Sequence, residues 1–98
     1  DTYKSEVAER ALDAGADIVN DIGGFHFDPE MAKLVAKRGC PAVIMHIKGT
    51  PKDMQKNPYY EDVVREIIQY FEKTIEDAKE KGVKEEQLII DPGIGFGK

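Results

Sequence analysis

The sequence predicts an α/β fold built from parallel (βα) units. Three observations indicate this fold. Short apolar runs rich in Ile and Val recur along the chain, segments of helical periodicity separate them, and a polar residue stands at the end of each run. Because each run has the length of a buried strand and closely follows a predicted helix end, right-handed crossovers in one parallel sheet are expected.

Three helices are predicted, each with a polar cap residue before it and a glycine after it. The boundary pairs are Thr2 and Gly15, Asp28 and Gly39, and Asn57 and Gly82, with Pro29 and Pro58 in the first turns of the second and third helices. The first helix is expected over residues 3–14. The apolar positions that recur at helical spacing, and are expected to face the sheet, are Val7, Ala8, Ala11 and Leu12, then Met31, Leu34 and Val35, then Tyr60, Val63, Val64, Ile67, Ile68, Phe71, Ile75 and Ala78.

The predicted strands cover residues 16–23, 41–47 and 87–91. In α/β folds, ligands bind where parallel strands end, in barrels and in open sheets alike. The strand-end residues are Asn20, Asp21, Met45, His46 and Asp91, and Asp1 stands where a strand before the first helix would end. The four acidic or amide side chains, those of Asp1, Asn20, Asp21 and Asp91, are therefore expected to converge on one site. The alternative is that Asp1 and Asp21 only cap loops.

The alternation of side chains along a strand makes this prediction more specific. If Asn20 lines the site, Asp21 must turn toward the helix layer or a loop. Met45 and His46 likewise cannot both point inward from an undistorted strand. We interpret His46 as an orienting group rather than as a general base or a metal ligand, and His26 as a loop residue.

The final segment, "IIDPGIGFGK", does not fit a nucleotide-binding loop. A Walker loop needs a glycine five positions before Gly97, and Pro92 stands there. Glycines at 93, 95 and 97 also lack the spacing of the dinucleotide fingerprint. A plain turn does not need three alternating glycines, so we interpret the segment as backbone that lies close to a flat ligand.

Composition narrows the function classes further. The 98 residues suffice for one domain or part of one, with 41% hydrophobic and 34% charged residues. A net charge of −5 without a basic patch argues against nucleic-acid binding. No apolar run approaches the roughly 20 residues of a membrane helix, and the start "DTYKSE" does not resemble a leader peptide. The single cysteine, Cys40, fits a cytoplasmic protein.

Four motifs in order carry a resemblance to a known family: "DTYK", "NDIGG", "MHIKGTPKDMQ" and "DPGIGFGK". At these separations they resemble dihydropteroate synthase over the whole length of the chain. The resemblance implies a TIM (β/α)8 barrel, of which residues 1–98 would form the middle, from the end of strand three to the loop after strand six. A complete barrel needs about 250 residues, so this segment alone is expected to be inactive.

The resemblance also implies the function and the site. The family joins 6-hydroxymethyl-7,8-dihydropterin diphosphate to p-aminobenzoate and releases diphosphate. It implies that the pterin-binding residues are Asp1, Asn20, Ile22, Met45, Asp91, Gly95 and Phe96. Asp1 is also implied to be catalytic, since it would stabilise positive charge on the pterin as the C–O bond breaks.

Other parts of the family's machinery are expected outside this chain. These are the Asn that binds Mg²⁺, the mobile loops after the first two strands, a Lys and an Arg-x-His diphosphate site, so no residue here is assigned to a metal. The full-length protein is expected to be a homodimer. Two alternatives stay open: a pterin-binding methyltransfer domain of the methyltetrahydrofolate type, and a non-catalytic barrel fragment that associates through exposed strand edges.

Overall fold

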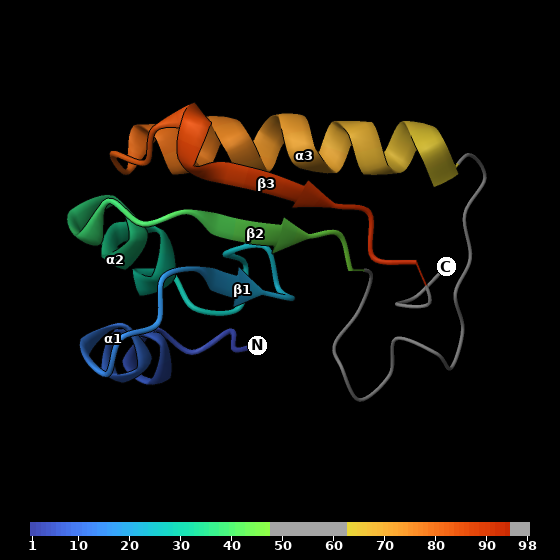
Figure 1. Ribbon diagram of the computed structural model, residues 1–98. Coiled ribbons are helices and arrows are strands. Elements are labelled where there is room, and N and C mark those ends of the chain that lie inside the picture. The colour runs from blue at the N-terminus through green and yellow to red at the C-terminus, as the bar shows by residue number, and fades with distance from the viewer. Residues whose placement is uncertain (48–62, 95–98) are drawn as a thin grey trace.

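The computed structural model describes residues 1–47 and 63–94. In this part of the chain, helices and strands alternate as predicted (Figure 1). The elements in order are α1 (Ser5–Asp13), β1 (Val19–Asp21), α2 (Glu30–Arg38), β2 (Ala42–Met45), α3 (Val63–Glu80), the 3-10 helix η1 (Glu85–Gln87) and β3 (Leu88–Asp91).

The three strands form one parallel sheet in the order β1-β2-β3, which confirms the predicted topology. All three point the same way, so their carboxyl ends lie at one edge of the sheet (Figure 1). The register places Asn20 beside Val43, and Met45 beside Asp91. Each observed strand is shorter than its predicted run: β1 and β2 lack residues at both ends, and β3 lacks only Gln87, which ends η1.

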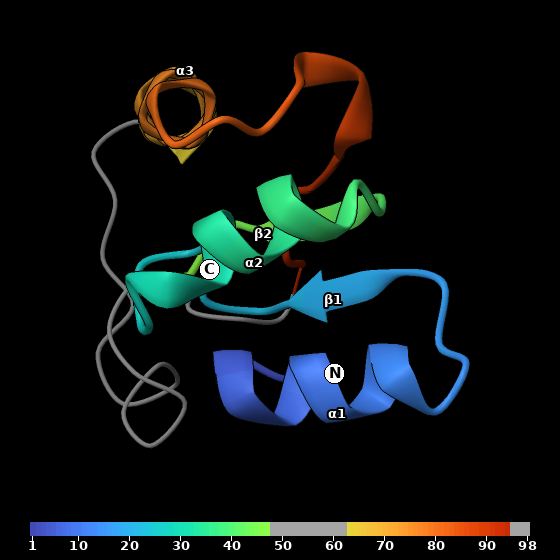
Figure 2. The ribbon, with the colours of Figure 1, turned by 90° about the vertical axis from the view of Figure 1, so that its left-hand side faces the viewer.

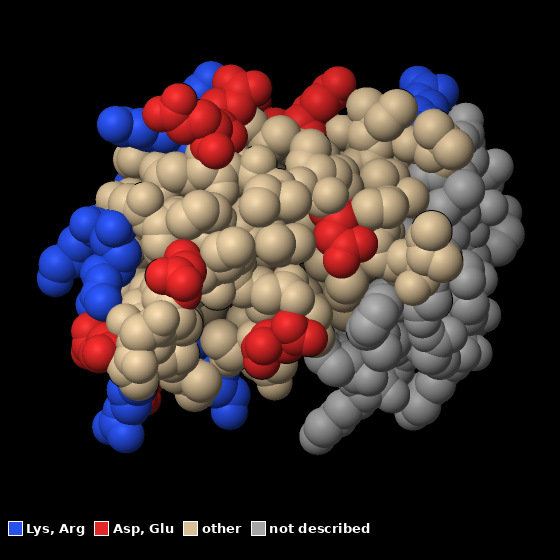
Figure 3. All heavy atoms as spheres, viewed as in Figure 1, with Lys and Arg blue, Asp and Glu red and all other residues tan. Residues whose placement is uncertain are grey.

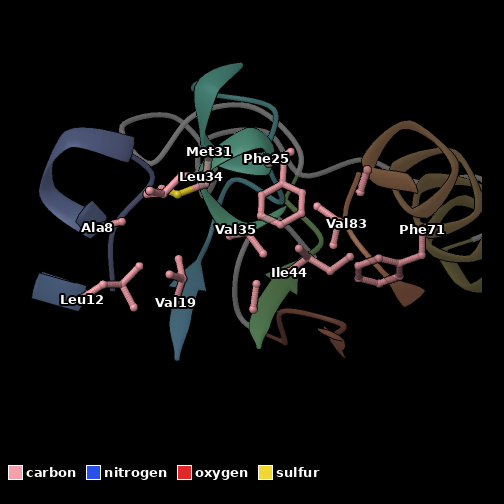
Figure 4. Close-up of a cluster of buried hydrophobic side chains, with 13 residues drawn as sticks. Ala8, Leu12, Val19, Phe25, Met31, Leu34, Val35, Ile44, Phe71 and Val83 are labelled. Carbon is pink, nitrogen blue, oxygen red and sulfur yellow. The ribbon is translucent and has the colours of Figure 1, made fainter. Parts of the chain in front are cut away.

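The helices pack on one face of the sheet, with α2 between α1 and α3 (Figure 2). The apolar core fills the space between them and the strands (Figure 4). Val19, Ala42 and Ile44 supply the strand side of this core, and all three are buried. The helix side comes from Ala8 and Leu12 of α1, from Met31, Ala32, Leu34 and Val35 of α2, and from Phe71 and Ala78 of α3, with Phe25 and Val83 from the connections.

The start and end of α2 follow the predicted chemistry. The Asp28 carboxylate accepts a hydrogen bond from the Glu30 backbone N–H at 2.9 Å, at the first turn of α2. Its second oxygen accepts from the Ser5 N–H at 2.8 Å, at the start of α1. Gly39 ends α2 in the left-handed region, with φ 69°, where glycine is favoured. One carboxylate therefore fixes the beginnings of two neighbouring helices.

The other two helices differ from the prediction at their starts. α1 begins at Ser5 rather than residue 3, and Thr2 accepts a hydrogen bond from the Lys4 N–H at 3.1 Å just before it. For the third helix, the predicted cap at Asn57-Pro58 and the predicted apolar position Tyr60 lie outside the described residues.

For four apolar residues, the prediction that they face the sheet is wrong. The side chains of Val7 and Ala11 in α1, and of Val64 and Ile68 in α3, are exposed. Three of them, Val7, Ala11 and Ile68, stand one residue from a packed position, which turns them about 100° around the helix axis. The apolar stripe of these two helices is thus wider than the contact that the described sheet offers.

Candidate functional site

Asn20, Met45 and Asp91, three of the residues predicted to form a site, share one face of the sheet. Val43 and Met45 are two positions apart on β2, so they point to the same side. Through the register, Asn20 lies beside Val43, and Asp91 lies beside Met45. This is the face away from the core, where Ile18 and Ile89 are 52% and 46% exposed. Ile22 follows β1 directly, at the same edge of the sheet.

Asp1 joins this group through Asn20. The Asn20 Nδ2 group donates a hydrogen bond to Asp1 Oδ1 at 2.6 Å, although the two residues are 19 positions apart. The Thr2 backbone N–H also donates to the Asn20 carbonyl at 3.0 Å. The first residues of the chain therefore lie against the free edge of β1. Asp1 and Asn20 also line a cavity of about 160 Å³ between α1 and β1, whose other lining residues include Ile18.

Asp91 ends β3 with its carboxylate held by the next turn. Its Oδ1 atom accepts a hydrogen bond from the Gly93 backbone N–H at 2.8 Å. Its carbonyl accepts from the His46 N–H at 3.0 Å, which continues the pairing of β2 with β3. Met45, its neighbour in the register, is buried. The Asp91 carboxylate therefore lies beside the Met45 thioether at the carboxyl ends of the strands. It is half-buried, and the hydrogen bond from Gly93 orients it.

Asp21 points to the other face, as the alternation of side chains predicts. It is fully buried, and its two oxygens accept hydrogen bonds from the backbone N–H groups of Gly23 at 2.8 Å and Phe25 at 3.0 Å. Burial raises the pKa of the Asp21 carboxyl, and these two hydrogen bonds oppose the rise. Phe25 has a positive φ of 72°, which costs a residue with a side chain about 1–2 kcal/mol. Asp21 is therefore a structural residue that stabilises this loop.

His46 likewise lies away from the site face. It follows Met45 on β2, is buried, and packs its ring edge-on against Tyr70 with 4.7 Å between ring centroids. As predicted, these two neighbours do not point the same way: Met45 lies on the site face, and His46 lies away from it. His26 is a loop residue, as predicted; its Nε2 atom lies 2.9 Å from the hydroxyl of Thr74 on α3.

Tyr70 is a site-edge residue that the sequence analysis missed. From α3, its hydroxyl donates to the carbonyl of Met45 at 3.2 Å and to that of Gly23 at 3.3 Å. Burial, with the nearby Asp21 charge as a smaller cause, raises the pKa of the Tyr70 hydroxyl. One feature of the sequence could have indicated this contact. A tyrosine next to Phe71, on the side of a helix that faces the sheet, needs a hydrogen-bond partner for its hydroxyl group.

Two predicted site residues, Gly95 and Phe96, lie outside the described residues. Within residues 1–47 and 63–94, no group of three or more His, Cys, Asp or Glu side chains could hold a metal ion. In the same part of the chain, no helix is both long and apolar enough to cross a membrane. The surface on the strand side is largely uncharged, with isolated acidic groups and basic groups toward its margins (Figure 3).

Comparison with known proteins identifies relatives along the entire chain. A family model described as "Pterin binding enzyme" matches residues 1–98. A dihydropteroate synthase of Synechocystis is 47% identical over 98 residues, which are 100% of this chain and 34% of that protein. The chain thus spans about a third of the length of this curated relative.

Solved structures give the same result in three dimensions. The Yersinia pestis dihydropteroate synthase with a sulfonamide drug complex superposes with a TM-score of 0.94 at 40% identity, covering 100% of this chain and 35% of that one. The Xanthomonas albilineans dihydropteroate synthase in complex with 7,8-dihydropteroate gives 0.86 at 36% identity, with 99% and 34% covered. The parallel strands and helices described above therefore correspond to about a third of such a structure.

Proposed function

The chain belongs to the family of pterin binding enzymes, with the fold of part of a TIM barrel, and from this premise we propose that it is the pterin-binding segment of a dihydropteroate synthase. The proposed reaction joins 6-hydroxymethyl-7,8-dihydropterin diphosphate to p-aminobenzoate and releases diphosphate. The observation that carries the proposal is the gathering of Asp1, Asn20, Met45 and Asp91 at one edge and on one face of the sheet.

The hydrogen bonds within the site suit recognition of a flat 2-amino-4-oxo ring. A carboxylate accepts two adjacent N–H groups in parallel, and Asp91 is oriented for this by its bond from the Gly93 N–H. Asn20 offers both a donor and an acceptor, and its Nδ2 group is oriented by Asp1. The amide oxygen of Asn20 would then accept from ring N–H groups, which would make its contribution specific.

Apolar neighbours complete the proposed pocket. Ile22 and Met45 would pack against the ring faces, and the thioether of Met45 adapts well to a heterocycle. Gly95 and Phe96 would border the pterin and p-aminobenzoate positions. The exposed sheet face beside Ile89 is the surface along which a planar ligand would lie.

In the proposed mechanism, the amine of p-aminobenzoate attacks the methylene carbon next to the pterin ring. The C–N bond forms, the C–O bond to diphosphate breaks with its electron pair leaving on diphosphate, and the new ammonium loses a proton. Positive charge grows on the pterin as the C–O bond lengthens. Asp1, with Oδ1 fixed by Asn20, would stabilise that charge, which is an interaction strongest in the transition state.

Several features of the whole enzyme belong to the same proposal. Residues 1–98 would run from the end of strand three to the loop after strand six of the barrel. Mg²⁺, if it assists the diphosphate, would be bound by residues outside this chain, and no step above depends on it. For the full-length protein, a homodimer is proposed on the resemblance alone, and a cytoplasmic location on the single cysteine, Cys40.

The test uses the intact protein that contains this chain, with carboxylate-to-amide variants. Asp91→Asn is expected to weaken pterin binding, measured calorimetrically, by about 10- to 100-fold, since a paired charge-assisted contact is worth about 1.5–3 kcal/mol. Asp1→Asn is expected to lower kcat more than it changes pterin affinity. The exposed Asp17→Asn is the matched control and should change neither quantity.

The same preparation separates the alternative functions. Formation of dihydropteroate from p-aminobenzoate supports the synthase. Methyl transfer from methyltetrahydrofolate without any use of p-aminobenzoate would favour the methyltransfer domain instead. An intact protein without pterin affinity would contradict both enzymes.

A further inference from the structure

The phenol of Tyr70 links two segments at the carboxyl edge of the sheet. Its hydroxyl lies 3.3 Å from the carbonyl oxygen of Gly23 and 3.2 Å from that of Met45. Gly23 directly follows Ile22 in the loop after β1, and Met45 ends β2. The two carbonyls share one phenolic proton, so a single group on α3 fixes the distance between the ends of two strands.

The space around this hydroxyl leaves little freedom for either segment. A Cβ atom at Gly24 would come within 2.5 Å of Tyr70 Oη and 2.9 Å of the Met45 carbonyl oxygen. Gly24 also has φ +56°, a conformation that a side chain disfavours. The loop after β1 therefore passes over the end of β2 at close contact, with the phenol between them.

The Tyr70 ring is held on several sides. Ring centroids of His46, His26 and Phe71 lie at 4.7, 4.9 and 5.3 Å from it, each tilted or edge-on. One turn later on α3, the Thr74 hydroxyl donates to the Tyr70 carbonyl at 2.8 Å and lies 2.9 Å from His26 Nε2. Because these contacts come from α3, the loop and β2, the phenol cannot change its position without moving all three.

We propose that Tyr70 is a positioning residue for the pterin pocket, which sets the separation of Ile22 and Met45 by binding the backbone carbonyls of Gly23 and Met45. This inference rests on the function proposed above. Tyr70 itself touches no substrate, since it approaches the strand ends from the helix layer. Its effect is to hold the two apolar walls of the pocket at the spacing of one flat ring.

The experiment replaces Tyr70 by Phe in the intact protein, which removes only the hydroxyl and keeps the ring contacts. Loss of the shared hydrogen bond is expected to raise KM for the dihydropterin diphosphate, and Kd for the pterin, by about 5- to 20-fold, with kcat within twofold of wild type. Amide hydrogen exchange of the loop after β1 is expected to become faster in the ligand-free variant.

Gln87, which lies near the amino ends of the strands, offers a matched control. Gln87 Nε2 donates to the carbonyls of Val35 at 3.2 Å and Cys40 at 2.9 Å, so it also joins two segments through backbone carbonyls. Gln87→Met removes those bonds at the amino ends of the strands. It is expected to lower thermal stability at least as much as Tyr70→Phe while leaving KM and Kd for the pterin unchanged.

Three outcomes are distinguishable. A raised pterin KM in Tyr70→Phe but not in Gln87→Met supports the positioning role. An unchanged KM in Tyr70→Phe, or an equal rise in both variants, overturns it while leaving the synthase proposal intact. A wild-type protein that neither binds pterin nor forms dihydropteroate instead overturns the function on which the inference rests.

Discussion

Replacing Asp21 by Asn should destabilise the protein strongly, because the Asp21 carboxylate holds the loop after β1. Its oxygens accept from the N–H groups of Gly23 at 2.8 Å and Phe25 at 3.0 Å. The side chain is fully buried, so bulk water cannot replace either bond. The loop also contains Phe25 at φ 72°, a conformation that persists only when its surroundings enforce it.

The size of the loss in stability follows from the number of hydrogen-bond acceptors on the side chain at position 21. An Asn side chain of the same shape has one acceptor oxygen, so one of the two N–H groups would face a donor. A bond to a charged group contributes about 1.5–3 kcal/mol, and an unsatisfied buried donor costs about 1–3 kcal/mol. Removing a buried charge offsets part of this loss, since burial raises the pKa of Asp21. We expect a net loss of about 2 kcal/mol for Asp21→Asn, and roughly twice that for Asp21→Ala, which satisfies neither N–H.

The assay is thermal unfolding of the intact protein, followed by circular dichroism. For a domain near 250 residues, 2 kcal/mol corresponds to a decrease in Tm of about 4–8 °C. Asp17→Asn, an exposed carboxylate four residues earlier in the chain, is the control and should stay within about 0.5 kcal/mol of wild type. Equal melting temperatures for Asp21→Asn and wild type would show that the carboxylate does not hold the loop.

Two further predictions concern pH and helix starts. Asp28→Ala should cost about 1–2 kcal/mol at neutral pH, because it removes the hydrogen bonds to Ser5 and Glu30 that begin α1 and α2. A hydrogen bond with the Ser5 side chain, followed by these two backbone hydrogen bonds, lowers the pKa of Asp28, so the wild-type advantage is complete above pH 3.8 and is lost as pH falls through the lower folded-state pKa. Urea unfolding at pH 7 and pH 2.5 measures the difference in stability between the two proteins, and an unchanged difference would contradict this prediction. Partial burial lowers the pKa of His26 below 6.5, so its contribution to stability is complete above pH 6.5 and decreases as pH falls below it. The charged groups that act on His26 are Asp77, Lys73 and Lys81. His26→Gln should therefore flatten the pH dependence of Tm between pH 7 and 5, and an equally steep profile would argue against this role.

Local patterns were sufficient to predict the elements and the faces of the strands. The glycines and Asp28-Pro29 mark where helices begin and end because their backbone preferences act within a few residues. Alternation along β1 separates Asn20 from Asp21, and the structure places Asp21 among backbone donors on the helix side. The expectation that Asp1 meets Asn20 came from topology, since parallel strands end at one edge.

The features that were missed depend on contacts between distant segments. Tyr70 binds the carbonyl of Gly23, 47 positions away, and no local pattern specifies which backbone oxygen a buried phenol will reach. Val64 and Ile68 fit the helical periodicity as well as Ile67 does, yet they are exposed. Periodicity shows that a helix has an apolar side, but the width of the packed contact depends on which neighbours are present.

The alternation of side chains along β3 makes the register of this strand important for the proposed site. Leu88 packs partly against the core, while Ile89 and Asp91 share the opposite side, and Asp91 stands opposite Met45. A shift of one residue in the pairing of β3 with β2 would exchange the two sides, so that the Asp91 carboxylate would face the interior and Ile90 would take its place beside Met45. The proposed pterin site therefore depends on the exact register of β3 against β2, and not only on the presence of an aspartate in the sequence.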